Sequence, residues 1–346
     1  MHVLVAMSGG VDSSVTAAIL RDDGHRVTGF TFMIAGYDAE KVNRSIRDAR
    51  RVAAHLGIPH YVTDVTDQFT CSVVEPFVQE YARGRTPNPC TICNRVLKFK
   101  LLLDAARDIG ADAVATGHYA RIERDDSNLC HLKTGIDSSR DQSYFLFNLS
   151  QAQLQRSIFP LGDWHKSAIR KKADLLKLPV ADKPDSQEIC FIPHDDYSRF
   201  IKEKYPHTLK PGDIVDTKGI YLGSHPGIQF YTIGQRKGIG AHAGRKYVVR
   251  IDAANNRIVI GDNDDLFRSE LRLRHCNWIV PPSASEFRAA AKIRSTSPPA
   301  LCTVICNPDY ITLRFDQPQR AITPGQAGVV YLADELLGGG FIDPLS

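Results

Sequence analysis

Residues 3–13 read Val3-Leu4-Val5-Ala6-Met7-Ser8-Gly9-Gly10-Val11-Asp12-Ser13. The first four are apolar, as in a short buried strand, and the spacing of apolar residues from Ser13 to Asp23 predicts a helix. Two glycines between them let the backbone approach a phosphate closely, and amides and hydroxyls at a helix start point at an anion. Asp12 can hold a Mg²⁺ ion that bridges a polyphosphate. Because the lysine of a Walker loop is absent here, we predict a nucleotide site of another kind.

The alternation of strand and helix continues to about residue 120. Apolar runs predict further strands at Arg26 to Ile34, Ile58 to Val65 and Ala111 to Thr116, with helical patterns between them. These lengths fit βαβ units, so we expect an α/β fold with a doubly wound parallel sheet that binds its ligand at the carboxyl ends of the strands. The segment from Arg121 to Thr134 resembles a hairpin, which we assign to the same domain.

After about Tyr205 the pattern changes to short alternating segments joined by glycine and proline. The predicted strands are Tyr247 to Ile251, Arg257 to Ile260, Ala300 to Cys306, Ile311 to Phe315 and Gly328 to Leu332. We therefore expect two small all-β modules after the parallel sheet, the last a six-stranded β-barrel. The expected domains are the parallel-sheet domain at 1–204, a small central β domain at 205–268 and the C-terminal barrel at 269–346.

The composition narrows the class of protein. The chain has 346 residues, 43% of them hydrophobic and 24% charged, which excludes collagen, a coiled coil and a disordered chain. No apolar run approaches the ~18 residues of a membrane helix and no signal peptide precedes the first strand, so we expect a cytoplasmic protein without a membrane partner. Eight cysteines are too few for a secreted disulfide scaffold. Residues 201–346 hold the whole net charge of +4, with 18 Lys and Arg against 14 Asp and Glu, which indicates a polyanionic partner.

Two cysteine-bearing segments carry candidate nucleophiles. The segment Thr86 to Asn94 holds Cys90 and Cys93 in a loop immediately before a helix predicted for Val96 to Ile109. The helix start and Lys98 would lower the pKa of a thiol there and favour the thiolate. A distant segment, Asp185 to Ile192, presents a third thiol. A single cysteine is more often a small buried hydrophobic residue, but two such segments in a chain with a phosphate loop favour a chemical role.

The loop Ser8 to Ser13 resembles the PP motif of the ATP pyrophosphatases, which split ATP into an adenylated substrate and pyrophosphate. Further motifs are Asn88-Pro89-x-x-x-Cys93-Asn94, Gly117-His118-Tyr119-Ala120, Asp141-Gln142-Ser143-Tyr144-Phe145-Leu146, Asp185-Ser186 to Cys190-Phe191-Ile192, and Gly223-x-His225-x-Gly227 to Tyr231-Thr232-Ile233-Gly234-Gln235-Arg236-Lys237-Gly238. In this combination and order, over residues 1 to about 335, the chain resembles the tRNA-specific 2-thiouridylases. That family belongs to the PP-motif ATP pyrophosphatases, whose fold is adenine nucleotide alpha-hydrolase-like.

The resemblance implies a reaction in two stages. ATP with Mg²⁺ adenylates the C2 oxygen of the wobble uridine in tRNA, and sulfur carried as a persulfide then displaces AMP to give 2-thiouridine. It implies that Cys190 carries the persulfide and that Cys93 releases its sulfur, leaving a disulfide between the two. A cysteine desulfurase or a sulfur-relay protein would deliver the sulfur. The implied ATP-binding residues are Ala6, Met7, Ser8, Gly9, Gly10, Val11, Asp12, Ser13, Met33 and Gly117.

Residues in both halves of the chain are implied to contact tRNA. They are Asn88, Pro89, Cys90, His118, Arg140, Asp141, Gln142, Arg294, Ser295 and Gln326. The family usually has Arg-Tyr where this chain has Arg294-Ser295, so no aromatic ring is available there to stack on the RNA. Judged from the residues alone, the stretch Tyr231 to Gly240 is a better candidate for phosphate contact, because it sets Arg236 and Lys237 between glycines.

Cys90 departs from the family, which commonly has Asp at this position. The substitution creates Cys90-x-x-Cys93, and three thiolates that converge with Cys190 suit a [4Fe–4S] cluster with one open iron better than a four-ligand zinc site. The other reading is sulfur transfer by persulfide alone, which needs only Cys93 and Cys190. Cys302 and Cys306 lie on a predicted strand, and we interpret them as packing residues.

Two other functions are compatible with parts of the sequence. A PP-motif ligase or amidotransferase acting on a small molecule would share the ATP site, but it would need neither the cysteine segments nor the basic β-rich tail. A tRNA-binding protein without catalytic activity would not need an intact loop at Ser8 to Ser13. The full set of motifs therefore favours the sulfurtransferase.

Overall fold

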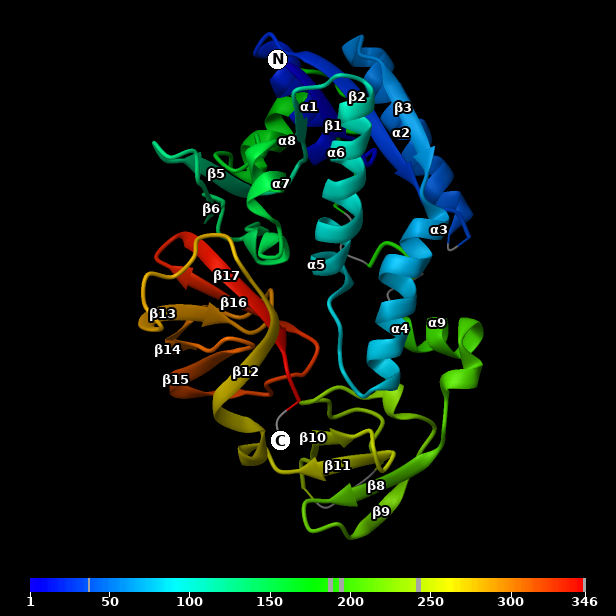
Figure 1. Cartoon of the computed structure of the whole chain (residues 1–346). Helices are drawn as coiled ribbons and strands as arrows, with labels where there is room; N and C mark the ends of the chain where they lie inside the picture. Colours follow the sequence, from blue (N-terminus) through cyan, green and yellow to red (C-terminus); the bar gives the residue numbers. More distant parts are fainter. Residues whose placement is uncertain (37, 186–188, 193–195, 241–243, 345–346) are drawn as a thin grey trace.

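The computed structural model describes residues 1–36, 38–185, 189–192, 196–240 and 244–344. Its strands form three sheets, of five, four and eight strands. In Figure 1 the first sheet and its helices lie at the top, the barrel at the lower left and the small central sheet at the bottom. Within the described ranges, none of the helices has the length and apolar character needed to cross a membrane.

The first sheet consists of five parallel strands in the order β3-β2-β1-β4-β7. They are β1 (His2–Ala6), β2 (Arg26–Met33), β3 (His60–Asp64), β4 (Ala113–Ala115) and β7 (Ser157–Ile158). The helices of this part are α1 (Val11–Asp22), α2 (Ala39–Leu56), α3 (Thr66–Phe69), α4 (Glu75–Ala82), α5 (Pro89–Cys93), α6 (Phe99–Asp108), α7 (Gln151–Gln155), α8 (Lys166–Leu175) and α9 (Tyr197–Lys204). Because the strand order runs in both directions from β1, the predicted doubly wound parallel sheet is confirmed.

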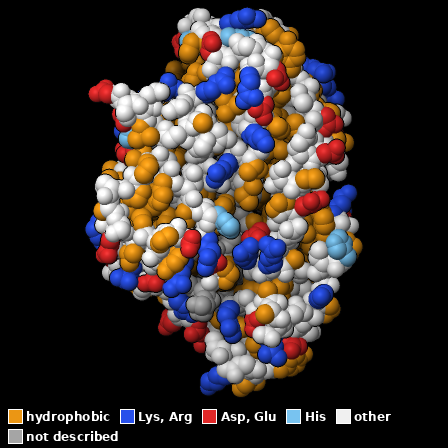
Figure 2. Space-filling view, in the orientation of Figure 1, with side chains coloured by type: hydrophobic (Ala, Val, Ile, Leu, Met, Phe, Trp, Pro, Cys, Tyr) orange, Lys and Arg blue, Asp and Glu red, His pale blue; other side chains and the backbone are white. Residues whose placement is uncertain are grey.

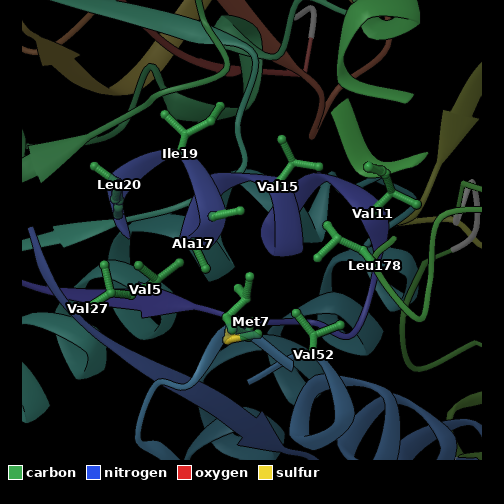
Figure 3. Packing of buried hydrophobic residues seen from close by; sticks show 14 of the residues in the cluster. Val5, Met7, Val11, Val15, Ala17, Ile19, Leu20, Val27, Val52 and Leu178 are labelled. Carbon is green, nitrogen blue, oxygen red and sulfur yellow. The ribbon is translucent and has the colours of Figure 1, made fainter. Parts of the chain in front are cut away.

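Helix α1 anchors the start of the chain because most of its residues are buried. Val15 and Ala17 have no exposed surface. Figure 3 shows α1 lying over the strands that carry Val5 and Val27, with Val52 of α2 beside them. A fully buried valine such as Val15 contributes about 1.5–3 kcal/mol to stability. The packing fixes the start of α1, and with it the loop that leads into the helix.

The helix that carries the first two candidate thiols begins earlier than predicted. Helix α5, a π-helical segment and α6 follow one another without a break. The run begins at Pro89, where a missing N–H is tolerated, and the side chain of Asn88 caps it by accepting the Cys90 N–H at 3.2 Å. The predicted start at Val96 was therefore wrong by about two turns. Cys90 and Cys93 lie inside the helix and not in a loop before it.

The small central sheet has four strands in the order β10-β11-β8-β9. They are β8 (Gly212–Asp216), β9 (Tyr221–His225), β10 (Tyr247–Asp252) and β11 (Arg257–Gly261). The predicted hairpin is present, because β10 and β11 are antiparallel with Asp252 opposite Arg257. Ile214, Val248 and Ile258 are buried together in the core of this sheet.

The third sheet contains a closed barrel of six strands. They are β12 (Phe267–Trp278), β13 (Glu286–Lys292), β14 (Ala300–Cys306), β15 (Ile311–Arg320), β16 (Ala327–Leu332) and β17 (Glu335–Ile342). Strand β12 pairs with β15 on one side and with β17 on the other, which closes the ring and confirms the predicted barrel. Cys302 is fully buried in the barrel core and Cys306 packs against it, as expected of packing residues.

A hairpin from the expected first domain joins the barrel sheet. Its strands are β5 (Ala120–Arg124) and β6 (Cys130–Thr134). Strand β6 pairs with β17, with Leu132 opposite Leu336. One apolar core runs through this joint and holds Leu4 and Phe99 together with Ala327 of the barrel. The sequence predicted the hairpin but not its neighbour, because alternation shows that one face of a strand is covered and not which segment covers it.

The contact between hairpin and barrel includes a pH-dependent pair. Nδ1 of His131 lies 2.6 Å from a carboxylate oxygen of Glu335. The hydrogen bond to Glu335 raises the pKa of His131, so the pair stabilises the fold below the usual histidine pKa of about 6.5 and loses that effect as the pH rises through the raised value. We expect His131→Gln to cost about 0.2–1 kcal/mol near pH 6 and little near pH 8, in calorimetric unfolding. An equal cost at both pH values would contradict this role.

Candidate active site

The residues predicted to bind ATP meet at one edge of the parallel sheet. Ala6 ends β1, Met33 ends β2 and Gly117 follows β4. Strand β1 lies between β2 and β4, and all three are parallel, so their carboxyl ends lie together. The loop from Met7 to Gly10 leaves β1 at the same edge and leads into α1.

Close backbone approaches shape this loop. Gly9 has a φ of 69°, and a Cβ at this position would collide with the carbonyl oxygen of Ser45 in α2. A Cβ on Gly117 would lie 3.0 Å from the backbone nitrogen of Ser13, so the end of β4 can approach the start of α1 this closely only with glycine. The hydroxyl oxygen of Ser13 accepts the N–H of Ser8 at 3.1 Å. The result is a compact turn at the start of a helix, where a phosphate group is favoured.

Asp12 lies in the first turn of α1, and its carboxylate binds two other side chains. The ammonium of Lys166 donates to both oxygens, at 2.7 and 2.8 Å, and the Tyr119 hydroxyl donates to one of them at 2.8 Å. Burial and the charge of Asp12 raise the pKa of Tyr119, so its hydroxyl stays protonated and can donate. Mg²⁺ needs only one or two carboxylates where substrate phosphates supply further oxygens, so this carboxylate fits the expected ion.

Lys166 also links Asp12 to the segment that carries Cys190. Its Nζ lies 2.8 Å from an oxygen of Asp185, and two arginines lie 2.6 and 3.2 Å from the same carboxylate. Burial acts to raise the pKa of Asp185, but the hydrogen bond from Lys166 and the surrounding positive charges outweigh it and lower that pKa. Residues 186–188 of the sequence motif lie outside the described residues.

A second lysine supports the phosphate loop from the side of α2. Nζ of Lys183 donates to the carbonyl oxygen of Gly9 at 2.9 Å and to the carboxylate of Asp48 at 2.6 Å. Because Asp48 belongs to α2, these bonds tie the loop to that helix. They also set a positive charge beside the turn at which a phosphate would bind.

The three candidate thiols share one neighbourhood. None of the three forms a disulfide. Cys190 lies close enough to Cys93 and Cys90 for their charges to raise its pKa. Burial raises the pKa of each thiol, that of Cys190 to about 12, and the charge of Lys98 offsets this only in part. The predicted lowering of the thiol pKa was therefore wrong, because desolvation outweighs the nearby positive charge. Cys90 and Cys190 nevertheless keep exposed surface.

The geometry does not arrange these thiols as a metal centre. Within the described part of the chain, no three or more His, Cys, Asp or Glu side chains are grouped so that they could hold a metal ion. Cys90 and Cys93 are three residues apart in one helix and share a face, but Cys190 does not complete a ligand set with them. The described residues therefore show no ligand set for the predicted [4Fe–4S] cluster.

Three residues predicted to contact tRNA form the first turn of α5, next to Cys93. Asn88 is its cap, Pro89 is buried at the first helical position, and Cys90 is exposed on the same turn. Arg140 approaches from another segment, with its guanidinium 3.2 Å from Asp185 and 39% of its side chain exposed. A partly exposed cation therefore lies close to the segment that carries the third thiol.

The neighbouring candidates for tRNA contact have hydrogen-bond partners within the chain. Asp141 accepts two backbone N–H groups at 3.2 and 3.1 Å, and the side chain of Gln142 accepts the N–H of Tyr119 at 3.1 Å. Nδ1 of His118 lies 2.7 Å from the hydroxyl oxygen of Thr116. Burial holds the pKa of His118 well below its usual value, so the imidazole is neutral. These hydrogen bonds hold the side chains in place, so the side chains shape the site in addition to any contact that they make with RNA.

The barrel residues predicted to contact tRNA lie at its joint with the first domain. The amide of Gln326 donates to the carbonyl oxygen of Thr86 at 2.8 Å, four residues before Cys90. Arg294 donates to the Thr323 hydroxyl at 3.1 Å, and Ser295 is half-buried next to it. Gln326 thus connects the barrel directly to the segment that carries the first two thiols.

Comparisons with known proteins agree along almost the whole chain. Residues 1–194 match the "tRNA methyl transferase HUP domain", 198–262 the "tRNA methyl transferase PRC-barrel domain" and 268–342 the "Aminomethyltransferase beta-barrel domain". The tRNA-specific 2-thiouridylase MnmA of Geobacter metallireducens is 46% identical over 99% of this chain and 96% of its own length. The chain belongs to the tRNA-specific 2-thiouridylase family. A second member, from Heliobacterium modesticaldum, is 48% identical over 98% of this chain and 92% of its own length.

Solved structures resemble the chain less closely than these members of the 2-thiouridylase family. The U34-tRNA thiolase NcsA from Methanococcus maripaludis, solved with its [4Fe-4S] cluster, covers 60% of this chain and 68% of its own at 18% identity. Its TM-score of 0.37 is too low for its cluster to bear on this chain. The resemblance of the sequence to the thiouridylases is confirmed by the family members alone.

Sequence reasoning missed two lysines of the site. Lys166 contacts Asp12 and Asp185, and Lys183 contacts Gly9 and Asp48. Neither lies in a motif quoted for the thiouridylase family. Lys166 opens a helix rich in basic residues, a pattern typical of a solvated face. One feature of the sequence could have indicated its role. Lys166 begins the helix that comes next after β7, a strand of the parallel sheet.

Proposed function

We propose that this chain catalyses the ATP-dependent 2-thiolation of the wobble uridine in tRNA. The observation that carries the proposal is the joining of two sites by one ion-pair chain. Lys166 binds Asp12 in the phosphate loop and Asp185 in the segment that carries Cys190. The thiol of Cys190 lies close enough to that of Cys93 for the charge of one to raise the pKa of the other. Activation by ATP and attack by sulfur would thus take place at adjoining positions.

In the first stage, the C2 oxygen of the uridine attacks the α-phosphorus of ATP and pyrophosphate leaves. Ala6 to Ser13, Met33 and Gly117 would bind ATP at the edge of the sheet. Asp12 would hold Mg²⁺, which neutralises charge on the phosphates. Lys166 and Lys183 would supply further positive charge where pyrophosphate departs. The adenylated oxygen becomes a good leaving group.

In the second stage, the thiol of Cys93 first gives up its proton to solvent, because burial raises its pKa, and the resulting thiolate attacks Sγ of the Cys190 persulfide. The S–S bond of the persulfide breaks, and its outer sulfur leaves with the electron pair as hydrosulfide. Hydrosulfide attacks C2 of the uridine, AMP leaves with the oxygen, and loss of a proton gives 2-thiouridine. A disulfide between Cys93 and Cys190 remains, and a thiol reductant restores both cysteines. The proximity of the two thiols supports this sequence of bonds.

The tRNA would lie across the thiol segment and the barrel. The residues proposed to contact it are Asn88, Pro89, Cys90, His118, Arg140, Asp141, Gln142, Arg294, Ser295 and Gln326. A cysteine desulfurase or a sulfur-relay protein would load Cys190 in the cytoplasm, where ATP and tRNA are both present. In this sequence of steps the sulfur comes from the persulfide of Cys190.

One assay separates the proposal from a small-molecule ligase and from a tRNA-binding protein without catalytic activity. Exchange of labelled pyrophosphate into ATP is measured with and without tRNA, and the tRNA is then digested and searched for 2-thiouridine. We expect exchange that depends on tRNA, followed by thiolation when a sulfur donor is present. Exchange without tRNA would support the ligase, and no exchange with retained tRNA binding would support the non-catalytic protein.

A further inference from the structure

The turn from Tyr231 to Gly240 is held in one shape by its own hydrogen bonds. The side-chain nitrogen Nε2 of Gln235 donates to the carbonyl oxygens of Phe230 and Lys237, at 3.2 and 2.9 Å. The hydroxyl of Tyr231 donates to the carbonyl oxygen of Gly238 at 3.0 Å. Three glycines of the turn have φ between 80° and 89°, a region that other residues rarely adopt. The turn therefore presents its side chains from a defined backbone.

The turn carries positive charge that no carboxylate of the described residues neutralises. Arg236 and Lys237 are exposed, and the stretch 231–240 contains no Asp or Glu. Where the structure describes the chain, neither side chain takes part in an ion pair. Two adjacent cations that keep their charge exposed favour an anionic partner.

The barrel brings two more cations to the same place. A Cβ on Gly234 would lie 3.7 Å from a guanidinium nitrogen of Arg320, so the two groups are neighbours across the joint between the domains. Burial lowers the pKa of Arg294, and the positive charge of Arg320 lowers it further. The second effect places the two guanidinium groups near each other. Among the described residues neither forms an ion pair with a carboxylate. Like charges brought together in this way repel unless an anion lies between them.

The same turn contacts the segment that leads to the thiols. The hydroxyl oxygens of Thr232 and Thr86 lie 3.1 Å apart, and the N–H of Thr86 donates to the barrel carbonyl of Pro324 at 2.8 Å. Cys90 lies four positions after Thr86 in the sequence, a path of at most about 14 Å. Figure 2 shows Lys and Arg side chains gathered over the middle and lower part of this face, at the level where barrel and central sheet meet in Figure 1.

We propose that Arg236 and Lys237 of the turn, together with Arg320 of the barrel, form one binding site for the phosphodiester backbone of tRNA. The site spans two domains and is complete only when the turn docks on the barrel. Contacts of this kind position an RNA without reading its bases. The inference rests on the proposed function, since it takes tRNA as the ligand.

The test is the salt dependence of tRNA binding by the full chain. The slope of log affinity against log salt falls by about one unit for each lost phosphate contact. We expect the double variant Arg236→Gln/Lys237→Gln to lower the slope by about two and Arg320→Gln to lower it by about one. The KM for tRNA should rise roughly tenfold or more in the double variant, with kcat at saturating tRNA within about twofold of the wild type.

Lys218→Gln is the matched control, because Lys218 is exposed in the same domain, in the turn between β8 and β9. We expect its slope to match the wild type. An unchanged slope in the double variant, or an equal loss in the control, would overturn the site. A wild-type chain that neither binds nor thiolates tRNA would instead overturn the proposed function, so the two failures can be told apart.

Discussion

Cys93→Ser should abolish formation of 2-thiouridine while pyrophosphate release on adenylation of the tRNA continues. A serine hydroxyl cannot attack the Cys190 persulfide at neutral pH, so the persulfide keeps its sulfur. The expected loss of thiolation is at least about 10³-fold. Nucleoside analysis by mass spectrometry measures thiolation, and labelled ATP measures pyrophosphate release. Equal loss of both activities would show that Cys93 supports the fold or the ATP site and is not the nucleophile.

Cys90→Ser is the matched control, because Cys90 lies one helical turn before Cys93 and its thiol is subject to the same Lys98 charge. If sulfur moves by persulfide alone, this variant keeps most of the activity. Iron and acid-labile sulfide are measured in anaerobically purified wild type and variant. A stoichiometric cluster in the wild type that Cys90→Ser loses together with thiolation would contradict the persulfide route.

Asp12→Asn should stop adenylation while the protein stays folded and still binds tRNA. An amide removes the negative charge that would hold Mg²⁺, and charge stabilisation of this kind is worth at least about 10²-fold in rate. Lys166 would keep a partner, because its Nζ also lies 2.8 Å from Asp185, so the variant leaves no buried charge unpaired. Tyr119 can still donate to the amide oxygen. Pyrophosphate exchange and tRNA affinity, measured on the same preparation, check the two halves of the prediction.

Asp22→Asn serves as the control for Asp12→Asn. Asp22 ends the same helix, and its ion pair with Arg21 lies on the surface, where such pairs contribute little. We expect normal exchange from this variant. Retained exchange in Asp12→Asn, or its equal loss in Asp22→Asn, would remove the assignment of Asp12 to the metal.

Local patterns were sufficient to predict most elements of the fold. The apolar run at Val3 to Ala6 and the Gly-Gly turn after it located β1 and the start of α1, because a buried parallel strand and a tight turn each have a strong sequence signature. Asn88 and Pro89 equally mark a helix start, yet the spacing of apolar residues predicted a helix that begins at Val96. Ordinary capping rules, applied to these two residues, locate the start of α5 correctly.

Properties that depend on distant contacts were beyond local patterns. The thiol pKa values illustrate this: the sequence shows Lys98 and a helix start, but the desolvation that outweighs them comes from segments far along the chain. Lys166 and Lys183 likewise acquire their roles only when α8 and the segment after it pack beside the phosphate loop. Motifs locate the residues that carry the chemistry, whereas the residues that orient them become visible only in the folded chain.

The pairing of β6 with β17 limits how the chain can be divided for expression. A fragment that ends near residue 204 would leave the backbone amides and carbonyls of β6 along Leu132 and Lys133 without their partners. The apolar surface that Ala327 and Leu336 cover would face water. Unpaired strands of this kind recruit strands from other molecules, so the isolated nucleotide domain should aggregate. In this chain the barrel acts as a solubilising cap for the domain that binds ATP, quite apart from any role in holding RNA.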